Sequence, residues 1–399
     1  MAFATIGTKG ITDAAIATDD IADNAVTSGK IAGGVIPASR PNAQPLIING
    51  DMAVAQRGTS TSSVSSGANY VSDRFTFAPS TAGTWTISQE AITSGSPFDN
   101  GFRTGFKADN TTANGSLSSG SNLQFAQKIE AQDLQLLKYG SSNAEKMTLS
   151  FWIKATKTGT NVIEIYGHDS GRSVSVAYTV STTNTWEKKT VLIPADTGGT
   201  INNDNGTGLE IIWWLVAGTD FTSGSLQTSW GSNTATARAV GQVNNADSTS
   251  NNVHITGVQL EVGEYTSDTL PPFQHESYGN NLSRCQRYYY FHASEATNND
   301  TDTQLCTTTN YNTSQTKGVI FFPQRMRAKP TLKQNTGSNM YRVYSNNANA
   351  TMDSLALSTG GTENYGVVYN GTSISVTAGT AGNLETMDGT AFVAFDAEL

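Results

Sequence analysis

The first 44 residues carry a β-branched aliphatic residue at every fifth position. The series consists of Ile6, Ile11, Ile16, Ile21, Val26, Ile31 and Ile36. In an α-helix a step of five residues turns by about 140°, so these side chains would be spread over every face. In a strand an odd step sends successive side chains to opposite faces. The spacing therefore predicts burial between copies of the segment, as a homotrimeric shaft with these residues in layers on the trimer axis.

Two other interpretations of this segment stay open. A low-complexity arm without fixed structure would have the spacing by coincidence, which seven positions in register disfavour. A single-chain coil, as in pentapeptide-repeat proteins, normally keeps Ala and Asp or Asn before the central residue, and this sequence does not. Pro37, Pro41 and Pro45 then predict a stiff, extended linker that ends the repeats. We expect a domain boundary between residues 44 and 45.

Beyond the linker, short apolar runs separated by Gly, Ser and Asn predict an all-β protein. In "MTLSFWIKA" (147–155) apolar and mainly polar residues alternate, which predicts a strand with one buried face. Its buried positions would be Met147, Leu149, Phe151 and Ile153. "IIWWLV" (211–216) is apolar on both faces and predicts a strand covered on both sides. Residues 122–140 have helical spacing, although their first half could equally be a strand.

The strand-like runs form two groups that divide near residue 266, so we expect two β-domains, 45–265 and 266–399, after the shaft of residues 1–44. With 38 Gly and only 14% charged residues, the composition supports strands and turns. The net charge of −9 and the absence of a Lys/Arg cluster argue against a nucleic-acid partner. No apolar run reaches about 18 residues and the N-terminus lacks signal-peptide features, so we expect neither membrane insertion nor export by a cleaved signal.

The chemistry-bearing residues are few. Two cysteines, Cys285 and Cys306, exclude a disulfide framework and a Cys-based zinc site, and leave open either one bridge or two free thiols. The four histidines are scattered, so a His-based metal site or catalytic triad has no support. No two carboxylates can be assigned as a glycosidase pair from their spacing. We therefore expect no enzyme activity and no cofactor.

One polar, loop-like segment, "SGSLQTSWGSNTATARAVGQVNN" (223–245), is the candidate carbohydrate site. A flat aromatic ring stacks on the apolar face of a sugar, while amides and charged groups bond its hydroxyls. The candidate residues are Trp230, Arg238, Asn244 and Asn245. An equally open interpretation is that Trp230 pins a long loop to the β-sandwich.

Several ordered motifs resemble one protein family. They are "LIINGDMAVAQRGTS" (46–60), "SDRFTF" (72–77), "SFWIKATKTGT" (150–160), "ITGVQLEVG" (255–263), "PFQHESYGNNLSRCQRYYYF" (272–291), "FPQRMRAKPTL" (322–332) and the terminal "DAEL". Together they resemble the tail-fibre and other virion-fibre proteins of marine and cyanobacterial bacteriophages. The resemblance implies a carbohydrate-binding-module-like jelly roll over 45–265, a C-terminal β-sandwich knob over 266–399, and a homotrimer with its N-terminal segment on the virion side.

From this resemblance we expect a phage fibre, on the tail or the capsid of the virion and assembled in the host cytoplasm, that attaches to a host surface polysaccharide without breaking bonds. A structural or decorative capsid fibre without a sugar site, and a polysaccharide-depolymerising tail spike, remain alternatives. Related jelly rolls often hold a structural calcium near positions equivalent to Asp51 and Glu261. Two solvated or capping carboxylates are the simpler interpretation, and we assign no metal.

Overall fold

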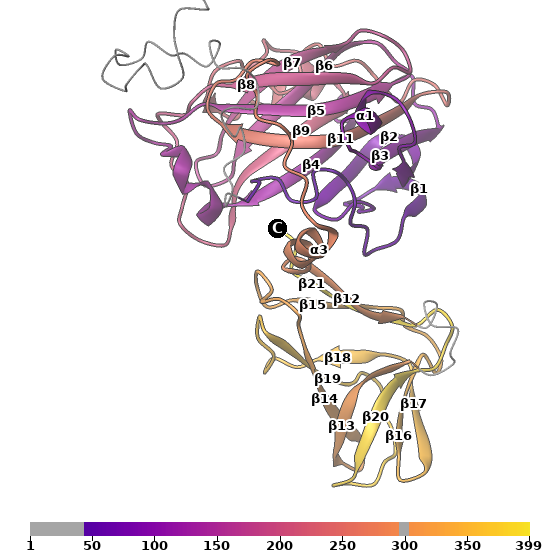
Figure 1. Ribbon diagram of the computed structural model, residues 1–399. Coiled ribbons are helices and arrows are strands. Elements are labelled where there is room, and N and C mark those ends of the chain that lie inside the picture. The colour runs from indigo at the N-terminus through magenta and orange to yellow at the C-terminus, as the bar shows by residue number, and fades with distance from the viewer. Residues whose placement is uncertain (1–43, 295–302) are drawn as a thin grey trace, which may run out of the picture. The chain divides into compact units, whose positions relative to one another are not determined.

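The computed structural model describes residues 44–294 and 303–399 (Figure 1). The predicted axis residues, Ile6, Ile11, Ile16, Ile21, Val26, Ile31 and Ile36, lie outside the described residues, so the shaft and the trimer stay predictions. The elements below all belong to one of the two units into which the chain divides, Pro45–Thr269 with His275–Leu399. The fold is all-β, as the sequence predicts.

An 11-stranded antiparallel sheet makes up the first part of this unit. Its strands are β1 (Ser60–Ser66), β2 (Phe75–Ala91), β3 (Thr104–Thr112), β4 (Asn122–Glu130), β5 (Met147–Ala155), β6 (Gly159–Gly167), β7 (Arg172–Val180), β8 (Glu187–Ile193), β9 (Thr207–Ala217), β10 (Gly231–Ser232) and β11 (Asn252–Val262). Short helices α1 (Ser96–Asp99) and α2 (Thr219–Thr222) and the 3₁₀ helices η3 (Ala131–Leu137) and η4 (Ala235–Ala237) lie in its connections. Strand order is β10-β7-β6-β9-β4-β2-β3-β11-β5-β8, with β1 paired to β2.

Strand β2 divides this sheet into two layers. Its first half pairs with β4 and its second half with β3. Between the halves, Thr81 and Gly83 have positive φ angles of 47° and 81°. A Cβ at Gly83 would lie 2.5 Å from the carbonyl oxygen of Thr112, so only glycine fits this bend. The sheet curls into a jelly-roll-like sandwich, in which β7, β6, β9 and β4 form the first layer and β3, β11, β5 and β8 the second.

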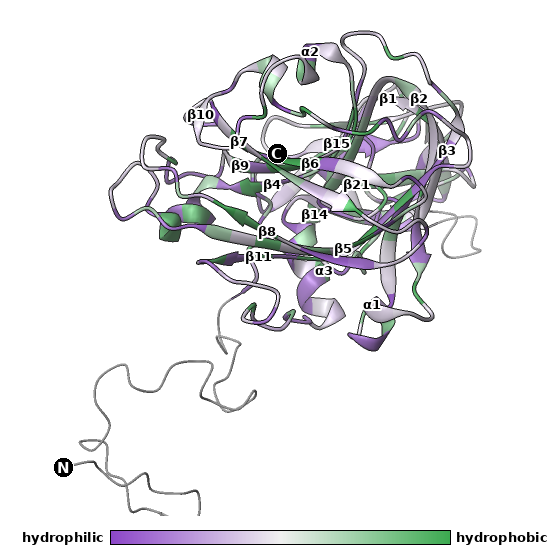
Figure 2. Ribbon diagram, turned by 90° about the horizontal axis from the view of Figure 1, so that it is seen from above, coloured by the Kyte–Doolittle hydropathy of each residue, from purple (hydrophilic) through white to green (hydrophobic). Residues whose placement is uncertain are grey.

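Aromatic rings from both layers meet in the core of the sandwich. Phe151 on β5 lies 5.5 Å from Trp213 on β9, between ring centroids. Phe106 on β3 stacks on Phe125 of β4 at 4.4 Å. Fully burying such a side chain stabilises the fold by about 1.5–3 kcal/mol. Figure 2 shows green, hydrophobic residues on the strands of the sandwich, β4 among them.

The strand predicted for residues 147–155 is confirmed, but its expected exposed face is wrong at Thr148 and Ser150, which are buried as well. The four predicted core positions of β5, Met147, Leu149, Phe151 and Ile153, are all buried. In β9, Trp213 belongs to the sandwich core, whereas Ile212 and Trp214 belong to a second cluster on the outer face, under residues 218–246. The helix considered for residues 122–140 is wrong for its first half, because Leu123 and Phe125 of strand β4 must point inward.

Two further sheets form the C-terminal part of the unit. They contain β12 (Tyr289–Ser294), β13 (Gln304–Asn312), β14 (Gln315–Phe321), β15 (Thr331–Gln334), β16 (Tyr341–Ser345), β17 (Ala348–Met352), β18 (Leu355–Leu357), β19 (Tyr365–Asn370), β20 (Ala381–Thr386) and β21 (Phe392–Asp396), preceded by helix α3 (Tyr278–Gln286). Three strands pair in the order β12-β21-β15 and seven in the order β17-β16-β20-β13-β14-β19-β18. Residues of both sheets, such as Val343 and Phe395, share one hydrophobic core. The domain boundary predicted between residues 265 and 266 stays a prediction.

Both cysteines are free thiols, and burial raises the pKa of each. None of the helices in residues 44–294 and 303–399 is long and apolar enough to span a membrane. Within the same ranges, no three His, Cys, Asp or Glu residues gather as metal ligands would.

Asp51 and Glu261, the positions considered for a structural calcium, each accept hydrogen bonds from the protein. Asp51 accepts from Asn281 and from the Ala53 N–H, while Glu261 accepts from Gln259.

Candidate functional site

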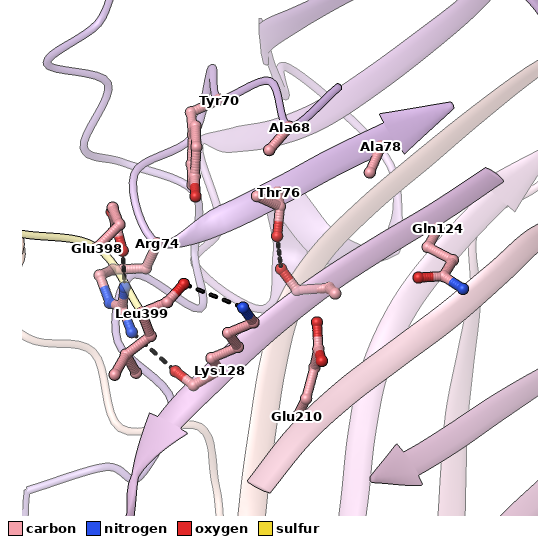
Figure 3. Close-up of a pocket in the computed structure, with 11 residues that line it drawn as sticks. Ala68, Tyr70, Arg74, Thr76, Ala78, Gln124, Lys128, Glu210, Glu398 and Leu399 are labelled. Carbon is pink, nitrogen blue, oxygen red and sulfur yellow. Dashed lines mark hydrogen bonds and ion pairs between the residues drawn. The ribbon is translucent and has the colours of Figure 1, made fainter. Parts of the chain in front are cut away.

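A pocket lies on the outer face of the first layer, beside strands β2, β4 and β9 (Figure 3). Its lining residues are Ala68, Tyr70, Arg74, Thr76, Ala78, Gln124, Ala126, Lys128, Glu210, Glu398 and Leu399. The cavity volume is about 210 Å³. Drug-sized pockets measure roughly 300–1,000 Å³, so this one suits a single sugar ring better than a long oligosaccharide.

Strand alternation explains why the wall of this pocket is polar. In β4, Leu123 and Phe125 point into the sandwich core. Gln124 and Lys128 therefore project from the opposite face, where they line the pocket. Glu210 reaches the pocket from β9 in the same way, because Leu209 and Ile211 take the core positions on either side of it.

Arg74 and Glu398 form the wall at one end of the pocket (Figure 3). The Arg74 guanidinium is buried, forms an ion pair with Glu398 and donates to the carbonyl oxygen of Lys128 at 2.7 Å. It also lies 3.4 Å from the ring centroid of Tyr288. The other carboxylate oxygen of Glu398 accepts from Arg57 at 3.3 Å. At this end of the pocket the charges of Arg57, Arg74 and Glu398 are therefore paired with one another.

Among residues 44–294 and 303–399, Lys128 and Glu210 have one hydrogen-bond partner each. The Lys128 ammonium donates to the main-chain oxygen of Leu399 at 3.0 Å. One oxygen of Glu210 lies 2.9 Å from Nε2 of His168, and the ring of Tyr166 lies edge-on to that imidazole at 4.7 Å. Both charged groups keep further hydrogen-bonding capacity, since an ammonium has three donors and a carboxylate has two acceptor oxygens.

Gln124 and Tyr70 have free polar ends. Within the described parts of the chain, neither the Gln124 amide nor the Tyr70 hydroxyl has a hydrogen-bond partner, and neither residue is fully buried. Burial, followed by the nearby Glu398, raises the pKa of Tyr70, so its hydroxyl stays protonated and can donate. Thr76 donates to the carbonyl oxygen of Ala126 at 3.1 Å and can still accept. The pocket thus offers unpaired donors and acceptors around a small cavity, which is the chemistry that sugar hydroxyls require.

The four residues predicted as the carbohydrate site lie outside this pocket. Trp230 donates its indole N–H to the carbonyl oxygen of Pro194 at 2.7 Å and packs against the sandwich core. This is the contact expected if Trp230 pins the loop to the sandwich. Arg238 forms two hydrogen bonds with Glu164, at 2.9 and 3.0 Å, and lies over the ring of Trp214.

Asn244 and Asn245 are likewise engaged within the protein. Asn244 donates to the carbonyl oxygen of Asn114 at 2.9 Å. Asn245 is buried and donates to the carbonyl oxygen of Leu215 at 2.8 Å. All four side chains thus hold residues 223–245 against the sandwich, and their role in sugar binding stays a prediction.

The pocket is not predicted by the sequence motifs, although the strand pattern carries part of the signal. The alternation of β4 marks Gln124 and Lys128 as residues of a polar face once the segment is assigned as a strand. Glu398 and Leu399 belong to the terminal "DAEL" motif, but nothing in the sequence places them beside residues 68–76.

No protein-family model matches the chain. No curated protein matches it. Among solved structures, the chain is similar to the enzymatically active domain of tailspike protein 4 from bacteriophage CBA120, with 16% identity and a TM-score of 0.27, over 47% of this chain and 19% of the tailspike chain. The chain therefore spans about a fifth of the length of that protein.

Two other similar structures are described as carbohydrate-binding. One is a proposed sugar-binding protein from Bacteroides thetaiotaomicron, with 15% identity and a TM-score of 0.27, over 55% of this chain and all of that one. The other is the family 11 carbohydrate-binding module of Clostridium thermocellum in complex with a mixed-linked tetrasaccharide, with 9% identity and a TM-score of 0.26, over 52% and 99%. At such TM-scores, these similarities assign no function to this chain.

Proposed function

We propose that the chain is a bacteriophage fibre protein that binds a host cell-surface glycan without cleaving it. In this account residues 1–44 join three copies into a shaft and attach them to the tail or capsid of the virion. The pocket beside β2, β4 and β9 holds one sugar ring of the glycan. The ordered sequence motifs support the phage-fibre assignment, and the geometry of the pocket supports the carbohydrate ligand.

The observation that carries the proposal is the set of unpaired polar groups in the pocket. The Tyr70 hydroxyl and the Gln124 amide face a cavity of about 210 Å³ and have no partner among the described residues. Glu210 and Lys128 add an acceptor and a donor to the same cavity. Each such site would be weak, but three copies acting together can raise avidity by about 10²-fold or more.

A depolymerase is the second candidate, because two carboxylates, Glu210 and Glu398, line the pocket. A glycosidase needs one carboxyl as a proton donor and another as a base or nucleophile. Arg57 and Arg74 each hold one oxygen of Glu398, so neither oxygen is free to approach a glycosidic bond. We therefore favour binding without catalysis. The appearance of new reducing ends when the protein is incubated with host polysaccharide would favour the depolymerase.

The proposal is tested by screening the full chain on a glycan array, then measuring affinity for the best glycan by calorimetry. We expect Gln124→Ala and Tyr70→Phe each to weaken binding about three- to tenfold, the effect of losing one hydrogen bond. Tyr278→Phe is the matched control, because Tyr278 is 60% exposed and outside the pocket. Unchanged affinity in both pocket variants, or no array signal at all, would overturn the proposal.

A further inference from the structure

A second group of aromatic and charged residues lies on the outer face of the second layer. Trp152 on β5 pairs with Lys188 on β8 in the strand register. Lys154 lies two residues further along the same face of β5, and its ammonium is 5.0 Å from the ring centroid of Trp186. Each tryptophan thus lies beside a lysine of the neighbouring segment: Trp152 beside Lys188, and Trp186 beside Lys154. We call these four residues the Trp–Lys face.

A glycine lies against each of the two rings. At Gly257 the backbone has a φ of +62°, and a Cβ there would lie 2.9 Å from Trp152 and 2.7 Å from Phe102. The strand pairing of β11 with β5 is irregular at the same place. A Cβ at Gly95 would lie 3.6 Å from Trp186, so that indole also lies against a glycine. A side chain at Gly257 would therefore displace the Trp152 ring, whereas the distance at Gly95 is an ordinary van der Waals contact.

The indole N–H groups of Trp152 and Trp186 have no protein acceptor within the described residues, and both side chains are half-buried. The N–H groups of Trp85, Trp214 and Trp230 each donate to a protein oxygen, and Trp213, whose N–H has no partner among the described residues, is fully buried in the core. Tryptophan that is only partly buried keeps its ring face and its donor available for a ligand.

The charges of this face are also unpaired. Neither Lys154 nor Lys188 forms an ion pair with any of the described residues. Glu90, across the layer, is engaged by the buried His254. Burial lowers the pKa of His254, Glu90 opposes this, and the positive charges of Lys154 and Lys107 lower it further. Two free ammonium groups next to two indoles therefore give the face a positive character on a chain of net charge −9.

We propose that the Trp–Lys face is a second carbohydrate site, specific for a polysaccharide segment that carries sulfate or carboxylate groups. The indoles stack on sugar rings and donate to their hydroxyls. The two ammonium groups bind the anionic substituents as point charges. The acidic chain as a whole disfavours nucleic acid as the occupant. The site uses no residue of the pocket, so it stands independently of the glycan proposed there.

The test measures binding of the full chain to dextran sulfate, to polygalacturonate and to neutral dextran at low and raised salt. We expect at least one of the anionic polymers to bind about tenfold or more tightly than dextran. The double variant Lys154→Ala/Lys188→Ala should lose about tenfold in affinity, or about 1.4 kcal/mol, together with much of the salt dependence. Comparison of the sulfated and carboxylated polymers identifies the anionic group.

Trp186→Ala is the second variant and should weaken binding while the protein remains folded, as judged by circular dichroism. Lys146→Ala is the matched control, because it removes one exposed lysine outside the face and should leave affinity unchanged. Gln124→Ala should also retain anionic binding, which separates this site from the pocket. Anionic binding that survives the double lysine variant would overturn the proposal, as would equally tight binding of single-stranded oligothymidine.

Discussion

At the scale of single residues, Asp73 is the most perturbed carboxylate next to the pocket wall. It is buried, accepts hydrogen bonds from the main chain and side chain of Gln56, and lies 3.6 Å from the guanidinium of Arg57. Burial outweighs these contacts and raises the pKa of Asp73 from 3.8 to about 6. Since the native state then binds this proton more tightly than the unfolded chain does, ionising Asp73 lowers stability.

This shift predicts a pH-dependent difference between the protein and its Asp73→Asn variant. As pH rises from 3.8 to about 6, the free energy of unfolding of the parent protein falls relative to that of the variant. The reason is that the folded parent must ionise the buried Asp73 carboxyl, whereas the variant has no such group. Above about pH 6 the difference should be constant. Urea unfolding of both proteins at pH 4, 5, 6 and 7 measures it. A difference in free energy of unfolding that does not change with pH would contradict the raised pKa.

Single residues were predictable from the sequence where the period of a strand decides their environment. Phe151 and Trp213 are examples, because alternation or an unbroken apolar run places them in the core. The pocket was not predictable, because Tyr70 and Glu398 meet across more than 300 residues of chain. Whether two residues so far apart in sequence line the same pocket depends on the order of the strands in the sheets. The local pattern of apolar and polar residues does not predict that order.

At the scale of elements, helix α3 and strand β4 are joined by a buried ion pair. Arg287, just after α3, binds both carboxylate oxygens of Glu130 at 2.7 Å. The Glu130 side chain is fully buried, and that of Arg287 is 30% exposed. Burial acts to raise the pKa of Glu130, but hydrogen bonds from Arg287, then Tyr288, outweigh it and leave the pKa lowered.

Removing one partner should therefore cost more than removing both. We expect Arg287→Ala to lower the free energy of unfolding by about 3 kcal/mol, because it leaves Glu130 buried and unpaired. The double variant Glu130→Gln/Arg287→Met, which has no uncompensated charge, should recover most of that loss. Chemical denaturation of the three proteins decides the matter. A single variant within about 0.5 kcal/mol of the parent would show that the pair is not needed.

The elements themselves were partly predictable. The alternating pattern of residues 147–155 correctly predicts strand β5. Residues 122–140 are ambiguous, because the spacing of Leu123, Phe125 and Ile129 is compatible with a helix and with a strand. The structure divides that segment into a strand and a 3₁₀ helix, η3. Pairing with β2 and β9 on both sides of β4 decides in favour of the strand, and those partners are distant in sequence.

At the scale of the whole molecule, we predict a trimer in which the Ile and Val residues at every fifth position of residues 6–36 pack against one another. Analytical ultracentrifugation of the full chain should give three times the 42.2 kDa of one chain. A variant with Ile16→Asp and Ile21→Asp should dissociate, because charge in shared apolar layers would be buried without a partner. Tyr278→Asp, on an exposed residue of α3, is the control. A monomeric parent protein with an intact N-terminal segment would contradict the shaft.

The central claim is that the pocket beside β2, β4 and β9 binds a sugar. A crystal structure of the full chain soaked with the oligosaccharide selected on the array tests it most directly. The account predicts a sugar ring within hydrogen-bonding distance of the Gln124 amide and the Tyr70 hydroxyl, with Glu210 as a further partner. Well-ordered sugar bound elsewhere on the protein, with this pocket filled only by water, would contradict it.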